Sequence, residues 1–280
     1  MVFQLAFSTN AFKRFTLADA LKSIAQAGYI GAELLCDVPH AYPPLFDDSE
    51  IGRTKKLIAD LGLKISNLNA FTLYGVGDVY RPSWIEEGDE KARQVRIKHT
   101  IDCIRMAEKI GAKNISTEPG GPAANGGASR RATMERLFVK GIKEAEKAAQ
   151  EHGVRILVEP EPGLLIENST QFLNFIKDVH SDLVGLNFDI GHFYCVREDP
   201  EKLIYRLADH IGHFHLEDIA ADRVHSHLLP GKGAIDFGPI LRAIESIGYS
   251  GFVTVELYPY QDDPASAARD ALEHLDAIIR

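Results

Sequence analysis

The sequence predicts a (β/α)8 TIM barrel, an α/β fold in which eight parallel strands alternate with helices. Three observations support this prediction. Amphipathic helical segments alternate with short β-rich runs along the whole chain. Six of these helices are followed directly by a glycine, as is common where a helix ends. Eight such units in 280 residues correspond to about 35 residues each, which fits a barrel of this kind.

The expected strands follow in chain order. The first covers residues 3–9 and opens the chain with FQLAFST. Six further strands are each expected beside a glycine that ends the preceding helix. These glycines are, in chain order, Gly28, Gly62, Gly111, Gly153, Gly212 and Gly248. The corresponding strands cover residues 29–35, 63–69, 113–118, 154–159, 211–216 and 252–257. The remaining strand, residues 184–189, follows the helix QFLNFIKDVH through a Ser-Asp turn. Because every connection between neighbouring strands is a helix, the strands must be parallel.

An open, doubly wound sheet is the competing arrangement. It would be favoured by a G-x-G-x-x-G turn after the first strand, but the turn here is STNAFKRFT, which has no glycine. Residues 1–280 are therefore expected to form a single TIM-barrel domain. The longest irregular insertion, residues 74–90, lies between the third strand and its helix and is expected to act as a lid.

Charge and cysteine content exclude some classes of function. A net charge of −9 argues against a surface that binds nucleic acid, because such surfaces need a basic face. The cysteines Cys36, Cys103 and Cys195 are far apart and odd in number, which indicates reduced thiols and a cytoplasmic location. The sequence also predicts neither a signal peptide nor a membrane span.

Polar residues stand at the ends of four consecutive expected strands. They are Glu159, Asp189, His215 and Glu256. Each one alone would more often be a helix cap or an ion-pair partner, but together they occupy the end of the barrel where such folds carry their chemistry. Three carboxylates and an imidazole suit Mn²⁺, Zn²⁺, Co²⁺ or Mg²⁺. The sequence therefore predicts a divalent metal site.

Other inward-facing polar residues are expected to support this site. His213 shares the inner face with His215 and is expected either to pack or to orient a ligand through its other nitrogen. Glu33 and Glu161 are expected to be polar supports rather than ligands.

The motifs resemble the xylose isomerase-like TIM barrel superfamily of sugar phosphate isomerases, sugar epimerases and AP endonucleases of family 2. The segments that carry the resemblance are VEP at 158–160, FDIGH at 188–192, HFHLED at 213–218, PGKGAIDF at 230–237 and GYSGFVTVEL at 248–257. The resemblance implies that the four strand-end residues bind one divalent metal. It also implies that Glu159 and Glu256 transfer protons and that His192 contacts substrate.

A second histidine pair departs from the epimerase pattern. The segment RVHSHLLPGKG looks like the AP endonuclease branch, in which the positions of His192, His225 and His227 bind an additional zinc. These three residues are therefore candidates for a second zinc site, with substrate binding as the alternative. Glu118 and Asn69 stand where that branch has histidine ligands, which weakens the endonuclease interpretation.

The function predicted is a metal-dependent sugar or sugar-phosphate isomerase/epimerase that moves a proton through an enediolate between Glu159 and Glu256. The alternatives are a multi-zinc phosphodiesterase of the AP-endonuclease type and an inosose or keto-acid dehydratase. A sugar, polyol or sugar phosphate is the expected partner, and a homodimer is expected. The candidates for substrate binding are His192, Arg223, Glu118 and Lys232, with the two basic residues placed for an anion.

Overall fold

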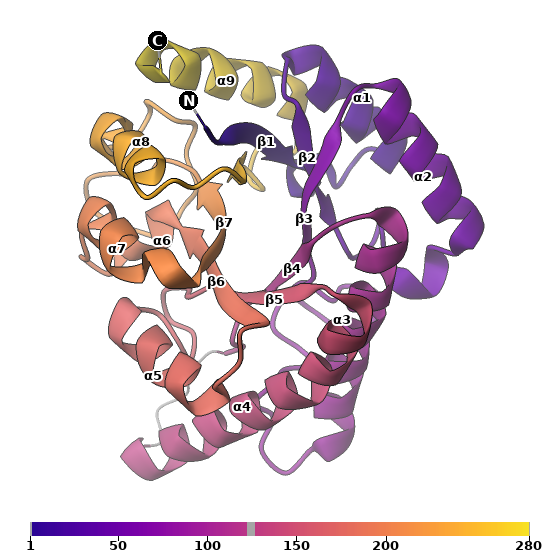
Figure 1. Cartoon of the computed structure of the whole chain (residues 1–280), viewed down its shortest axis with the longest axis vertical. Coiled ribbons are helices and arrows are strands. Elements are labelled where there is room, and N and C mark those ends of the chain that lie inside the picture. The colour runs from indigo at the N-terminus through magenta and orange to yellow at the C-terminus, as the bar shows by residue number, and fades with distance from the viewer. Residues whose placement is uncertain (1, 122–126, 280) are drawn as a thin grey trace.

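The computed structural model describes residues 2–121 and 127–279, and its strands form one closed parallel barrel in chain order (Figure 1). The strands are β1 Gln4–Ser8, β2 Gly31–Leu35, β3 Lys64–Asn69, β4 Asn114–Thr117, β5 Arg155–Val158, β6 Val184–Asp189, β7 Ile211–Leu216 and β8 Phe252–Val255. Strand β1 pairs with β8, which closes the ring. The predicted fold class is confirmed.

Helices surround the barrel on its outside (Figure 1). They are α1 Leu17–Ala27, α2 Asp48–Asp60, α3 Glu90–Ile110, α4 Gly127–His152, α5 Ser169–Val179, α6 Ile190–Cys195, α7 Pro200–Leu207, α8 Phe237–Ser246 and α9 Pro264–Ile279. Short 3-10 turns occur at Thr9–Phe12, Pro43–Leu45 and Ala208–His210. In the described part of the chain, no helix combines the length and apolar character that a membrane crossing requires.

Local capping determines where helices end and strands begin. Helix α1 starts where the Thr16 side chain accepts a hydrogen bond from the Asp19 backbone N–H, and it ends at Gly28, whose φ is 106°. Helix α3 ends in the same way at Gly111, with a φ of 94°. A residue without Cβ adopts this left-handed conformation at little cost, so the chain can turn back into the next strand.

Strand register places apolar and polar side chains on opposite faces of the barrel wall. Phe188 of β6 pairs with Phe214 of β7, and their rings contact each other in the layer between barrel and helices. One residue further along the same two strands, Asp189 of β6 pairs with His215 of β7. Because side chains alternate along a strand, these two point into the barrel.

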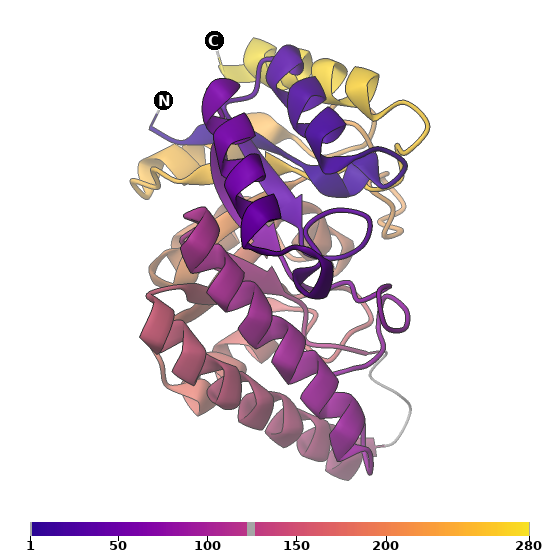
Figure 2. The same cartoon turned by 90° about the vertical axis from the view of Figure 1, so that its right-hand side faces the viewer.

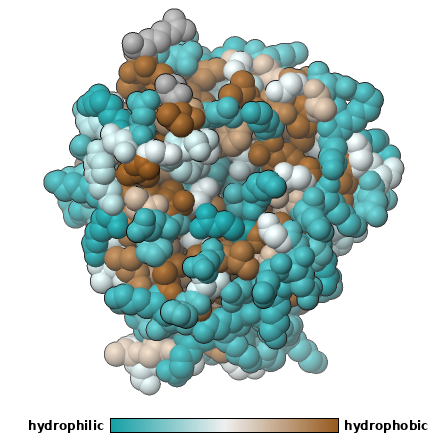
Figure 3. Space-filling model, in the orientation of Figure 1, coloured by the Kyte–Doolittle hydropathy of each residue, from teal (hydrophilic) through white to brown (hydrophobic). Residues whose placement is uncertain are grey.

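The loops that follow the carboxyl ends of the strands gather on one side of the molecule, at the right in Figure 2. The other end of the barrel carries the N-terminus. Figure 3 shows that face, where hydrophilic residues are interspersed with hydrophobic ones.

Candidate metal centre

The predicted quartet converges at the carboxyl end of the barrel. Glu159 follows β5, Asp189 ends β6, His215 lies on β7 and Glu256 follows β8. One ligand atom of each residue lies within 4.8 Å of the others, and all four residues are buried. His215 Nδ1 is 3.0 Å from Glu159 Oε1 and 3.8 Å from Glu256 Oε1. The same nitrogen is 4.0 Å from Asp189 Oδ2, so all three carboxylates face one imidazole nitrogen.

The donor set of this quartet fits a divalent cation. Burial raises the pKa of Glu159 to about 7 and raises the pKa of Glu256 well above its ordinary value. Asp189 Oδ2 is buried and has no hydrogen-bond partner among the described residues. Buried carboxylates without donors are costly, and a cation held by three carboxylates and an imidazole removes that cost. We conclude that these residues can hold one metal ion.

Glu33 on β2 orients the imidazole of the quartet. Its Oε2 lies 2.8 Å from His215 Nε2, and both side chains are completely buried. The Asn67 amide donates to the same oxygen at 2.7 Å and holds it in place. A carboxylate on one ring nitrogen of a histidine leaves the other nitrogen for a metal. Glu33 therefore has the geometry of a support, as expected from the sequence.

His213 does not orient His215. Neither of its ring nitrogens has a hydrogen-bond partner among the described residues, and its Nε2 is 3.7 Å from Glu33 Oε2. Burial lowers its pKa to about 3, so the ring is neutral. Two roles were expected for His213, packing or orienting a metal ligand. Only packing fits, because Glu33 already contacts the nitrogen of His215 through which His213 would have to orient it.

Three asparagines hold the two glutamates of the quartet. Asn187 donates to Glu159 Oε2 at 2.6 Å. Asn10 and Asn69 donate to Glu256 Oε1, at 2.7 and 3.1 Å. Neutral amide donors fix the orientation of a carboxylate without cancelling its charge, so both glutamates remain able to bind a cation or a proton. Asn10 and Asn187 were not identified from the sequence.

The three histidines His192, His225 and His227 also come together. Their ligand nitrogens lie within 4.8 Å of one another. His192 Nδ1 is 3.0 Å from the Pro160 carbonyl and His227 Nδ1 is 2.9 Å from the Glu256 carbonyl, so these nitrogens carry protons and donate. Each Nε2 then keeps a lone pair for a metal, a donor or a substrate hydroxyl. His225 Nε2 is 3.1 Å from His227 Nε2.

A further group of metal-ligating type was not predicted from the sequence. It consists of Asp189, Glu217 and His227, whose ligand atoms lie within 4.8 Å of one another. Glu217 directly follows β7 and is completely buried. The signal that could have identified it is its position two residues after His215, which puts both side chains on the same side of the strand.

A cavity of about 190 Å³ opens onto the quartet. Its lining residues are Asn10, Lys13, Leu35, Asn69, Phe71, Thr72, Tyr74, Val79, Tyr80, Glu118, Glu161, His192, His225, His227, Glu256 and Tyr258. Burial, together with the neighbouring Glu161 carboxylate, raises the pKa of Glu118 well above its ordinary value. Lys13 lies over the rings of Tyr74 and Tyr258. The cavity therefore offers many hydrogen-bonding groups around a single cationic side chain.

The expected anion-binding residues lie outside this cavity. Arg223 donates to the Tyr194 carbonyl, and its guanidinium stacks on the Tyr194 ring at 3.9 Å. Lys232 is exposed and is not among the residues that line the cavity. The Arg223 backbone has a φ of 63°, which turns its side chain in a direction that sequence spacing does not reveal.

The insertion after β3 covers the cavity. Residues 70–89 contain no helix or strand, and Tyr74 and Tyr80 from this segment line the cavity. The Asp37 carboxylate accepts hydrogen bonds from the backbone N–H groups of Tyr74 and Gly75, at 2.5 and 3.0 Å. The segment is thereby tied to the loop after β2, in the position expected of a lid.

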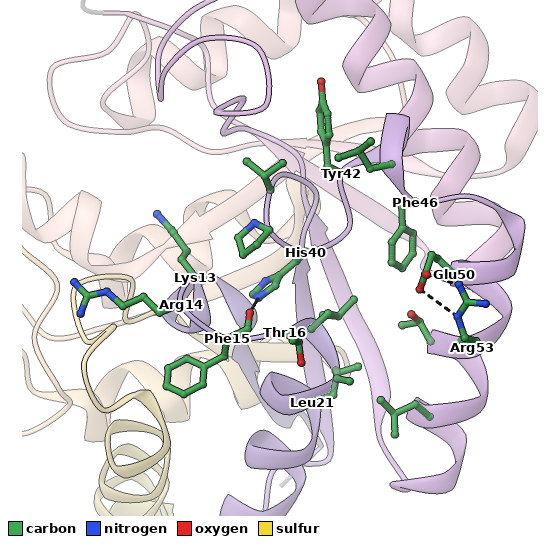
Figure 4. A pocket seen from close by; sticks show the side chains of 17 residues that line it. Lys13, Arg14, Phe15, Thr16, Leu21, His40, Tyr42, Phe46, Glu50 and Arg53 are labelled. Carbon is green, nitrogen blue, oxygen red and sulfur yellow. Dashed lines mark hydrogen bonds and ion pairs between the residues drawn. The ribbon is translucent and has the colours of Figure 1, made fainter.

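A larger cavity of about 760 Å³ lies beside the site, between α1 and α2 (Figure 4). Lys13 lines both cavities. In the larger one, Arg53 is paired with Glu50 and the His40 ring contacts the Phe15 carbonyl at 3.2 Å. No metal-ligating group of the described residues lies there, so the smaller cavity is the candidate active site.

Comparison with known protein families identifies the family of this chain. The sequence model of the family described as "Xylose isomerase-like TIM barrel" matches residues 21–278. The chain belongs to this family. The resemblance drawn from the strand-end motifs is thereby confirmed.

Proteins similar to this chain include an epimerase and dehydratases. The fructoselysine 3-epimerase of Escherichia coli O157:H7 is 25% identical over 279 residues, which cover 97% of this chain and 96% of that enzyme. The inosose dehydratase of Clostridium beijerinckii is 24% identical, with 91% and 85% covered. That of Lacticaseibacillus casei is 33% identical over 166 residues, so this match spans about half of each protein, 52% and 54%.

Solved structures share the fold. A D-tagatose 3-epimerase-like protein superposes with a TM-score of 0.81 at 22% identity, and the IOLI protein with a bound zinc atom superposes with a TM-score of 0.80 at 21% identity. Each match covers 99% of this chain and 98% of the other. At these identities the likeness establishes the fold.

Proposed function

We propose that this protein is a metal-dependent isomerase or epimerase of an uncharged sugar or polyol ketone. The observation that carries the proposal is that Glu159 and Glu256, which follow β5 and β8, face the same nitrogen of His215. Two carboxyl groups on either side of one substrate carbon are what a proton transfer from one face to another requires.

The ion would be held by Glu159, Asp189, His215 and Glu256. When bound, it supplies positive charge to two adjacent substrate oxygens, a carbonyl and the neighbouring hydroxyl, and so favours loss of the α-proton.

The two glutamates perform the proton transfers. One carboxylate removes the α-proton; the C–H bonding electrons form a C=C bond and those of the carbonyl π bond move to its oxygen, which gives an enediolate. The other carboxyl returns a proton to the opposite face of the same carbon, and the carbonyl re-forms. In an isomerisation the proton goes instead to the former carbonyl carbon, and the proton of the neighbouring hydroxyl moves to the former carbonyl oxygen. In the metal-free site, burial raises the pKa of Glu159 to about 7.

The lining of the cavity supports an uncharged substrate. His192 Nε2 is buried without a hydrogen-bond partner among the described residues, so it is free to receive a substrate hydroxyl. Glu118 adds a carboxyl group, and Lys13 is a cation near Glu256. Because Arg223 and Lys232 lie elsewhere, a phosphate group would meet few positive charges here. We therefore assign His192 and His225 to the substrate rather than to a second zinc.

A dehydratase acting on an inosose is the second candidate, and the matches to inosose dehydratases favour it. Its first step is the same removal of an α-proton by a glutamate. The second carboxyl then protonates the β-hydroxyl, the C–O bond breaks and water leaves. An endonuclease of the multi-zinc type is disfavoured, because the two positions where that branch has histidine ligands carry Asn69, whose amide donates a hydrogen bond to Glu256, and the carboxyl group of Glu118.

Incubation of the metal-loaded enzyme in D2O with a panel of ketohexoses and inososes tests the proposal. The wild type is expected to exchange the α-proton for deuterium, while Glu159→Gln and Glu256→Gln lose exchange by at least about 10²-fold when each is assayed at a metal concentration that saturates its site. Glu50→Gln, on the surface of α2, is the matched control. Exchange at the wild-type rate in either active-site variant would refute the assignment. Loss of water from the product would identify the dehydratase.

A further inference from the structure

We propose that Asp189, Glu217 and His227 form a second divalent cation site, in which Asp189 bridges to the ion of the quartet. This inference rests on the proposed function in one respect, namely that the quartet holds a first ion. The proposed site shares His227 with the cluster of His192, His225 and His227 but uses neither His192 nor His225.

The buried carboxyl group of Glu217 is the observation that points to a cation. The residue is completely buried, yet neither of its oxygens has a hydrogen-bond partner among the described residues. It contacts the Asp189 carboxylate, whose Oδ2 is also buried and without a partner. Two carboxylates cannot donate to each other when both are ionised, so a positive species must lie between them.

The backbone is shaped to receive this carboxylate. Glu217 packs directly against Gly191 in the first turn of α6, and a Cβ on that glycine would lie 1.7 Å from Glu217 Oε1. Any side chain at position 191 would thus displace the carboxyl group. Gly191 therefore serves a close approach, and it keeps Glu217 beside Asp189.

His227 completes the site with a neutral nitrogen. Its Nδ1 is occupied by the Glu256 carbonyl, which leaves the lone pair on Nε2. With the proton on Nδ1, the Nε2 atom is unprotonated, as a metal ligand must be, and it lies 3.1 Å from His225 Nε2.

The three-histidine cluster is the competing position for a second ion. A cation there would have three neutral ligands and would leave Glu217 without a partner. A cation at Asp189, Glu217 and His227 instead meets two negative charges and one imidazole, a set suited to Mn²⁺ or Zn²⁺. Electrostatic attraction in a buried site favours the charged set.

Metal counting on purified full-length protein separates these positions. The wild type, saturated with Mn²⁺ or Zn²⁺ and dialysed, is expected to hold two ions per chain. Glu217→Gln and Gly191→Ala are expected to keep the first ion and lose the second, whereas His225→Ala keeps both. His227→Ala is expected to lose the second ion in either arrangement. Urea unfolding curves would show that each variant is folded.

Each other result overturns the proposal. Two ions in Glu217→Gln combined with one in His225→Ala would place the second ion in the histidine cluster. One ion in the wild type would mean that Glu217 and Asp189 share a proton, and it would leave the proposed function intact. A wild type without any bound metal would refute both the second site and the proposed function.

Discussion

Replacing Glu33 by glutamine is expected to weaken metal binding at the quartet. The perturbation removes one negative charge and little volume. Glu33 touches no substrate-facing group of the cavity, and its effect must pass through His215, whose Nε2 is 2.8 Å from Glu33 Oε2. Glu33 is thus a positioning residue, and the quantity to measure is metal affinity rather than turnover alone.

The magnitude follows from that single contact. A hydrogen bond to a charged group contributes about 1.5–3 kcal/mol, and each 1.4 kcal/mol is a factor of ten in affinity. Because the pair is completely buried, solvent does not reduce this value. The dissociation constant for Zn²⁺ or Co²⁺ should therefore rise by about 10- to 100-fold, which is the range known for partners of metal-binding histidines.

The assay is competition titration of the metal-free protein with a chromogenic chelator, at pH 8, where protons compete least with the metal. Glu50→Gln serves as the control, because Glu50 lies on the surface of α2 and pairs with Arg53. Unfolding curves in urea are measured in parallel. A Glu33→Gln protein that is folded and binds metal as tightly as the wild type would refute the reasoning.

Three further predictions concern pH, the lid and the anion residues. In the metal-free protein the folded state binds the proton of Glu159 more tightly than the unfolded state does, because the pKa of Glu159 is about 7 in the folded protein against 4.5 as the ordinary value. The free energy of unfolding should therefore fall as pH rises from about 5 to about 7. Urea unfolding at several pH values should show a smaller dependence of this free energy on pH in Glu159→Gln, and an unchanged dependence would contradict the prediction. Asp37→Ala should free the segment after β3, which would appear as several-fold faster limited proteolysis within residues 74–89 and a higher KM. Arg223→Ala should leave kcat/KM for an uncharged substrate within about threefold, since the residue lies outside the cavity; a tenfold loss would return it to the substrate site.

Much of the candidate site was predictable because barrels place strand ends together. Glu159, Asp189, His215 and Glu256 could be recognised as one group since each follows or ends a strand of alternating pattern. The grouping of His192, His225 and His227 could also be predicted, but only from the resemblance to the AP endonuclease branch. The homodimer and the cytoplasmic location stay predictions.

The partners of these residues were not predictable from spacing. Asn10 lies 246 positions from Glu256, and Glu33 lies 182 positions from His215, yet each pair is in hydrogen-bond contact. Such contacts depend on how the ring closes and how its strands are staggered. The irregular register between β6 and β7 is one example, because it sets which residues of β7 stand beside Asp189.

The sequence by itself determined the alternation of strands and helices, the closure into a barrel and the identity of the strand-end residues. The physical reason is that hydrophobic periodicity and helix-ending glycines are local properties, readable over a few residues. Tertiary structure alone decided that Glu33 contacts His215, that Glu217 lies against Gly191, and that Arg223 lies outside the cavity. Those outcomes depend on distances between elements far apart in the chain, which strand stagger and loop conformation set.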